Sequence, residues 1–171
     1  MTAFTVWKFN DPDSATEAAV SLKSAAADGL VKVLDHAIVS WPQGASHPTT
    51  THHHEETRRG AGWGALWGIL AGSLFFVPVV GGVVGASIGA ISKATQDSGI
   101  TREQLETIRT QITEGTSALF AVTENADFDR LGDRLKMSST LIATNLTEAE
   151  RSVLLETFGG TDATHPSSDS P

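Results

Sequence analysis

The feature that most constrains this chain is a run without any charged side chain, from Gly60 to Ser92. Glycine recurs at every fourth position in both halves of the run, which would place the glycines on one face of a helix. Because glycine weakens a helix by about 1 kcal/mol relative to alanine, such a register needs a compensating gain. A groove of small residues supplies it by letting two backbones approach closely, best where water is excluded. These glycines are Gly60, Gly64, Gly68 and Gly72 in the first half, and Gly81, Gly85 and Gly89 in the second.

Pro78 divides the run, because proline removes a helical hydrogen bond, and Gly81-Gly82 follow it closely. The sequence therefore predicts an antiparallel helical hairpin, a glycine zipper, with arms over 60–77 and 80–95. The flanking charges favour a hairpin over one kinked span, since a hairpin brings them to the same end. Two tryptophans near that end are suited to a bilayer interface. These anchors are Arg58, Arg59, Trp63, Trp67 and Lys93.

Each arm would be about 25 Å long at 1.5 Å per residue, slightly short for the roughly 30 Å hydrocarbon core of a bilayer. A re-entrant or deeply inserted hairpin, or local thinning of the bilayer, would accommodate that length. The alternative is that the uncharged segment forms the buried core of a soluble homo-oligomer. The sequence leaves both possibilities open.

The rest of the chain reads as a soluble α+β domain. Alternating apolar and β-branched residues predict strands, and apolar residues at helical spacing predict helices. We expect Asp13 or Ser14 to cap the first helix, Thr147 to begin the last, and a disordered tail from Gly160. The expected strands are Phe4–Phe9, Val33–Trp41, Ser117–Thr123 and Ser139–Leu146, with a short arm over Thr49–Glu56. The expected helices follow Ser14, Thr101, Asp127 and Thr147.

Without the uncharged segment and the helix after it, the order of the elements is βαββαβ, the ferredoxin-like split βαβ arrangement. The predicted fold is therefore a ferredoxin-like sheet with an inserted glycine-zipper hairpin and an extra C-terminal helix. The predicted divisions are 1–57 for the first half of the domain, 58–97 for the hairpin, 98–159 for the second half and 160–171 for the tail.

Three stretches together resemble a bacterial family, the domain-of-unknown-function family numbered twelve sixty-nine, commonly labelled predicted membrane protein. They are ATEAAVSLKSAAADGLVKVLDHAIV, GAGWGALWGILAGSLFFVPVVGGVVGASIGAIS and SALFAV, in that order. The resemblance covers roughly residues 3–158. It implies a ferredoxin-like domain with an inserted glycine-zipper hairpin and implies no reaction. The three consecutive histidines depart from the family, where one would be expected.

Those histidines form the one cluster with metal-ligand chemistry, His52-His53-His54-Glu55-Glu56, with His47 nearby. Consecutive residues of a strand point to opposite faces, so only His52 and His54 could share a metal ion, and a third ligand would have to come from elsewhere. We expect an exposed polar arm, with His52 and His54 as weak metal candidates; a pH-sensitive role in binding anionic lipid is also conceivable.

No pattern in the chain predicts catalysis. Asp35 and His36 are neighbours on a strand and would face opposite sides, so we expect a partly exposed histidine rather than a catalytic pair. The glycines from Gly60 to Gly64 fit the four-residue period better than a dinucleotide loop. Asp127 and Asp129 suit a helix start. We therefore expect a protein that is not an enzyme and needs no cofactor.

The net charge of −8 argues against nucleic acid as a partner. There are no cysteines, and the N-terminus lacks the features of a secretory signal. The sequence predicts a membrane-associated protein that binds itself and the lipid bilayer, on the cytoplasmic side of the bacterial inner membrane or in the cytoplasm. The alternatives are a soluble ring, cage or filament with hairpins in its core, and a small-ligand or metal-binding regulatory module; a channel is also possible, although the hairpin has no polar stripe.

Overall fold

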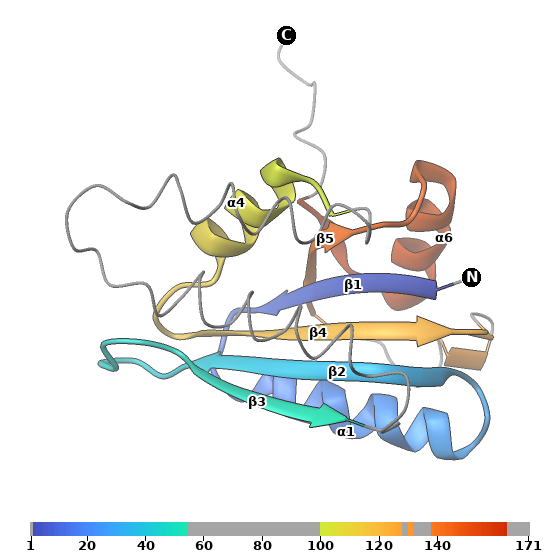
Figure 1. Cartoon of the computed structure of the whole chain (residues 1–171), viewed down its shortest axis with the longest axis horizontal. Coiled ribbons are helices and arrows are strands. Elements are labelled where there is room, and N and C mark those ends of the chain that lie inside the picture. Colours follow the sequence, from blue (N-terminus) through green and yellow to red (C-terminus); the bar gives the residue numbers. More distant parts are fainter. Residues whose placement is uncertain (1, 55–99, 128–129, 132–137, 164–171) are drawn as a thin grey trace, which may run out of the picture.

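A computed structural model describes residues 2–54, 100–127, 130–131 and 138–163 of the chain. Its described part is an α+β structure built on a six-stranded sheet of order β3-β2-β4-β1-β5-β6 (Figure 1). All neighbouring strands are antiparallel except β5 and β6, which are parallel, so the sheet is mixed. The strands are β1 (Thr2–Phe9), β2 (Lys32–Trp41), β3 (Thr49–His54), β4 (Thr116–Glu124), β5 (Thr140–Thr144) and β6 (Thr161–Asp162).

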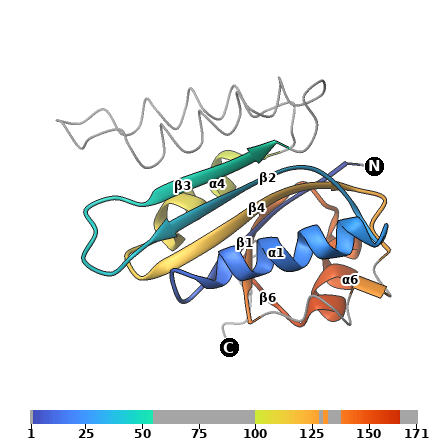
Figure 2. The same cartoon turned by 90° about the horizontal axis from the view of Figure 1, so that it is seen from below.

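Three helices that the structure describes in full lie on the two faces of this sheet. Helices α1 (Ser14–Ala27) and α6 (Glu148–Phe158) cover one face, and α4 (Arg102–Gln111) lies on the other (Figure 2). Each face carries its own cluster of buried residues, since alternate residues of a strand point to opposite sides. The cluster under α4 includes Phe4, Ile108 and Phe120. The cluster under α1 and α6 includes Trp7, Leu22 and Phe158.

The predicted strands are all present, with small differences at their ends. The predicted helix after Ser14 is also present, and its buried residues lie on one face: Ala15, Ala18, Ala19, Leu22 and Ala25. Asp13 occupies the N-cap position of α1, as the sequence predicts, but its side chain makes no capping hydrogen bond. The carboxylate of Asp11 lies at this end of the helix and accepts the N–H groups of Asp13 at 3.0 Å and Ser14 at 2.8 Å. The Ser14 hydroxyl also donates a hydrogen bond to Asp11 Oδ2. This bond contributes most to lowering the pKa of Asp11, and the two N–H bonds lower it further.

The last helix begins as the sequence predicts. Thr147 and Glu150 form a capping box, in which the Thr147 hydroxyl accepts the N–H of Glu150 and the Glu150 carboxylate accepts the N–H of Thr147. Gly159 ends α6 in the left-handed conformation, with φ of 70°. Val153 of this helix is 49% exposed, whereas Leu154 and Phe158 are buried.

The chain beyond Gly160 differs from the predicted disordered tail over its first residues. Thr161 and Asp162 form β6 beside β5, with the Thr161 N–H donating to Ser139 O at 3.0 Å and the Ala163 N–H to Leu141 O at 2.9 Å. An ion pair between Arg151 Nε and Asp162 Oδ2, at 2.9 Å, ties this strand to α6. The composition of the segment is polar, but these tertiary contacts order it.

Candidate functional site

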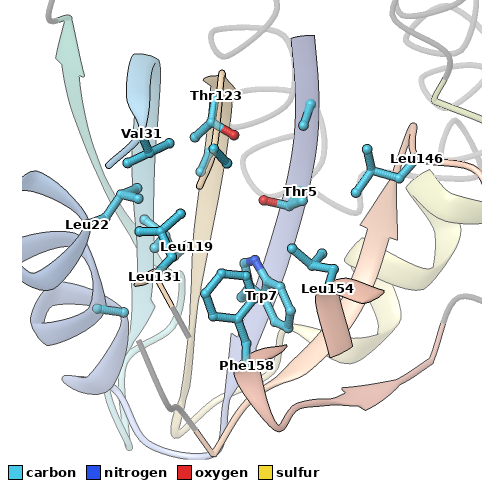
Figure 3. Close-up of a pocket in the computed structure, with 14 residues that line it drawn as sticks. Thr5, Trp7, Leu22, Val31, Leu119, Thr123, Leu131, Leu146, Leu154 and Phe158 are labelled. Atoms are coloured by element: carbon cyan, nitrogen blue, oxygen red, sulfur yellow. The ribbon is translucent and has the colours of Figure 1, made fainter. Parts of the chain in front are cut away.

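An apolar groove lies on the sheet face between α1 and α6 (Figure 3). The register of β1 and β4 builds its floor, because Ala3, Thr5 and Trp7 lie opposite Thr123, Ala121 and Leu119. Residues at alternate positions of paired strands share one face, so these six side chains are neighbours. The described lining residues are Ala3, Thr5, Trp7, Ala18, Leu22, Val31, Leu119, Ala121, Thr123, Ala126, Leu131, Leu146, Leu154 and Phe158.

Trp7 is the largest side chain in the groove. Its ring packs edge-to-face on Phe158 of α6, with the centroids 6.1 Å apart and the planes at 77° (Figure 3). Gly160 approaches the same ring so closely that a Cβ there would lie 2.9 Å from Trp7 Cζ3. The end of α6 and the residue before β6 therefore fix the position of the indole, and with it one wall of the groove.

A second hollow adjoins this groove at the end of β4 and shares Ala3 and Thr123 with it. The groove has a volume of about 60 Å³ and the adjoining hollow about 300 Å³. The hollow is lined by polar residues as well, with Glu124, Asn125 and Glu150 beside the half-exposed Val153. Asn125 has a φ of 53°, a left-handed conformation that asparagine tolerates better than most residues.

The carboxylates are the only titratable groups among the described residues of the groove and the hollow. Hydrogen bonds from the Thr147 hydroxyl and, second, from the Thr147 N–H lower the pKa of Glu150. Glu124 accepts a hydrogen bond from the Thr2 hydroxyl at 2.8 Å. An apolar molecule whose polar end is neutral or cationic would match this combination of floor and mouth.

The histidine arm is the second feature to consider. β3 lies at the edge of the sheet, with His52 opposite Ala37, His53 opposite His36 and His54 opposite Asp35. The predicted pairing of this arm is therefore confirmed for Thr49–His54. Within the described ranges, no three histidine, aspartate or glutamate residues are grouped so that they could bind a metal ion. His52 and His54 consequently remain weak candidates from sequence alone.

His36 is not the partly exposed residue that the sequence predicts. It is 1% exposed, and the neighbouring Asp35 is fully buried, because β2 is an interior strand between β3 and β4. His36 lies opposite Ala121 and Asp35 lies opposite Val122. Ala121 and Val122 belong to the core clusters on different faces of the sheet. An irregularity in the pairing between Val33 and Asp35 precedes them, and the His36 backbone N–H donates to Asp35 Oδ1 at 2.8 Å.

The remaining predicted site residues lie outside the described residues. They are the zipper positions Gly60, Gly64, Gly68, Gly72, Pro78, Gly81, Gly85 and Gly89, and the anchors Arg58, Arg59, Trp63, Trp67 and Lys93. Of the predicted helix after Asp127, only Arg130 and Leu131 are described, and Leu131 is buried. In the described part of the chain, no helix is both long enough and apolar enough to cross a bilayer.

Sequence reasoning missed the groove, because its floor depends on the register between two distant strands. Trp7 and Leu119 are each apolar residues on a predicted strand, but only pairing places them side by side. The alternation of Ala3, Thr5 and Trp7 was a usable signal for one wall, while the contact between Trp7 and Phe158 had no local signature.

These observations define an α+β protein with a mixed sheet, helices on both faces and an apolar groove on one of them. The chain belongs to a family of proteins of unknown function (DUF1269), whose model matches residues 61–159, more than half of the sequence. The match begins within the uncharged segment and continues through α4, β4, β5 and α6. Comparison with curated proteins gives no match, and comparison with solved structures gives none.

Proposed function

We propose that this protein is a non-enzymatic, self-associating protein that attaches to the bacterial inner membrane through a glycine-zipper hairpin formed by residues 60–95. The observation that carries the proposal is the run from Gly60 to Ser92, which combines the absence of charge with glycine at every fourth position. Uncharged helices with small-residue grooves associate closely where water cannot compete for the backbone. The binding partners of each chain are then other copies of the same protein and the lipid bilayer.

The same proposal includes the finer fold. Strands β2, β4, β1 and β5 are neighbours in that order, each pair antiparallel, and α1 connects β1 to β2. This order supports a ferredoxin-like split βαβ arrangement of the four strands. The hairpin would then be an insertion between β3, at one edge of the sheet, and α4, on one of its faces.

Liposome flotation of the full-length protein tests attachment, and light scattering in mild detergent tests self-association. The test variant is Gly68→Leu, Gly85→Leu, which fills the zipper groove. Its matched control is Ala65→Leu, Ser87→Leu, which adds bulk off the glycine row. We expect wild type and control to float and to share one mass, and the test variant to lose mass. A wild type that stays at the bottom of the gradient, or a test variant that assembles normally, overturns the proposal.

The groove between α1 and α6 favours a second candidate function, a module that binds a small apolar ligand. Its floor is almost entirely apolar, and the carboxylates at its mouth favour a neutral or cationic ligand. Binding of N-phenyl-1-naphthylamine, a neutral apolar fluorophore, tests this candidate. Ala3→Leu adds bulk at a residue that lines both the groove and the adjoining hollow, and should weaken binding at least tenfold. Ala149→Leu, on an exposed position of α6, should not.

A further inference from the structure

Among the described residues, β3 is the outermost strand at one edge of the sheet, and no described strand pairs with its outer side. It is six residues long, pairs with β2 without irregularity, and contains only Thr49–Thr51 and His52–His54. Edge strands are usually protected from pairing with other chains by shortness, charged residues, proline or a bulge. Within residues 49–54, β3 has none of these protections. It is also free of acidic residues, in a chain whose net charge of −8 would otherwise oppose the approach of a second copy.

The direction of the backbone groups can be followed across the sheet from Phe4. Its N–H donates to Asn145 Oδ1 at 2.8 Å, and its C=O accepts from the Asn145 N–H at 3.3 Å, so both groups point toward β5. In an antiparallel sheet, successive residues direct their N–H and C=O to opposite sides. Thr5 therefore bonds to Ala121 of β4, and the next residue, Val122, points to β2.

The same alternation continues to the edge. Phe120, like Val122, points to β2 and pairs with Ala37, so Ile38 points the other way and pairs with Thr51 of β3. A hydrogen bond from the Gly115 N–H to Trp41 O, at 2.7 Å, supports this assignment. Trp41 is an even number of residues from Ala37 along β2, so its backbone groups point to the same side, toward β4. The backbone groups that point away from the sheet consequently belong to Thr50, His52 and His54.

We propose that this edge pairs with the β3 strand of a second copy, antiparallel and about a two-fold axis at His52, to give one sheet continuous across both copies. In this register His52 faces itself, and Thr50 faces His54 of the other copy. All three outward residues are then paired, which gives about six backbone hydrogen bonds. A register centred on Thr50 would form fewer backbone hydrogen bonds, because it places Pro48, which has no N–H, opposite His52 of the other copy.

This inference rests on the self-association in the proposed function and names a surface for it. It does not need the zipper, since the bonds come from backbone groups of β3. A dimer formed in this way has the closed symmetry that is commonest among homo-oligomers.

The mass of the full-length protein in mild detergent tests the inference with three variants. Thr50→Pro removes an outward N–H and should lower the mass two-fold, while circular dichroism stays that of wild type. Thr50→Val keeps that N–H, so its mass should equal that of wild type. Gly68→Leu, Gly85→Leu tests the zipper separately. If only the glycine variant changes the mass, the β3 contact is wrong and the proposed function stands; if only Thr50→Pro does, the β3 contact stands and the zipper fails.

A single cysteine gives an independent test, because the chain has none of its own. His52→Cys should form a disulfide-linked dimer on mild oxidation, since residues facing each other in a ladder have Cα atoms about 5.5 Å apart, within the range for a disulfide. His53→Cys is the control, because across this axis its Cα atoms are about 7–8 Å apart. Cross-linking that is equal at both positions, or absent at His52→Cys, overturns the register.

Discussion

The two edges of the sheet are built in opposite ways. β6 is two residues long and is bound by the Arg151–Asp162 ion pair and by backbone bonds to Ser139 and Leu141. β3 is six residues long, uncharged apart from its histidines, and lies outermost in the sheet order. A short edge, tied to a helix, offers little to another chain, whereas a long regular one offers a row of donors and acceptors. The comparison favours the β3 edge, rather than the β6 edge, as the place where a strand of another chain can pair with the sheet.

The largest effect is expected for proline on the inner side of β3. Thr51→Pro removes the N–H that bonds to β2 and leaves the Ile38 carbonyl unpaired, at a cost of about 2–3 kcal/mol. Thr50→Pro should cost less than about 0.5 kcal/mol in the dissociated protein, because prolines are tolerated where the N–H points away from the sheet. Urea denaturation at low protein concentration measures both. Equal losses would show that the backbone alternation derived for β3 is wrong.

At the β6 edge, the second largest effect is expected at Gly160. A Cβ there would lie 2.9 Å from Trp7 Cζ3 and 3.2 Å from Ser139 O, and the backbone oxygen cannot move freely. Gly160→Ala should lower the free energy of unfolding by about 2 kcal/mol through overpacking. Gly159→Ala has open space around it but a φ of 70°, and should cost about 1 kcal/mol through backbone strain alone. A reversed order would contradict the close approach of Gly160 to Trp7.

The ion pair of the β6 edge has a smaller effect. The side chains of Arg151 and Asp162 are 14% and 25% exposed, so Arg151→Ala should cost about 1 kcal/mol. It should also speed amide exchange at Thr161 and Ala163. The control is Arg102→Ala, whose partner Glu106 is 3.6 Å away with both side chains more than half exposed, and which should change stability little. Unchanged exchange at Ala163 in Arg151→Ala would mean that β6 does not depend on the pair.

The smallest effect is a pH dependence in α6. Thr147 lowers the folded-state pKa of Glu150, so this contribution to stability is complete above the unfolded pKa of about 4.3 and is lost as the pH falls through the folded pKa. The difference in unfolding free energy between wild type and Glu150→Gln should be constant near neutrality and shrink below roughly pH 4. Glu156→Gln, on the same helix, serves as the control. A difference that grows on acidification would contradict the capping box.

The sequence predicted the elements where one local signal was sufficient. The strand from Phe4 to Phe9, the helix after Thr101 and the helix start at Thr147 all reappear in the structure. These features depend on neighbours within one or two turns or along one strand. The family was also identified correctly from the order of its motifs.

What the sequence did not reveal depends on contacts between distant residues. The burial of His36 follows from the position of β2 inside the sheet, and the order at Thr161 follows from Arg151 and Ser139. The groove needs the register of β1 with β4 as well as the position of Phe158. These features depend on tertiary contacts, so local reasoning assigned a partly exposed histidine at position 36, a disordered tail and a set of separate core residues.

Amide hydrogen exchange along β3, measured residue by residue at high and low concentration of the full-length protein in detergent, tests the central claim most directly. The amides of Thr49, Thr51 and His53 should be protected at both concentrations by β2. Those of Thr50, His52 and His54 should be protected at the high concentration and exchange freely on dilution. Outward amides that exchange freely at every concentration, or that stay protected in the monomer, would contradict pairing of this edge with a second copy.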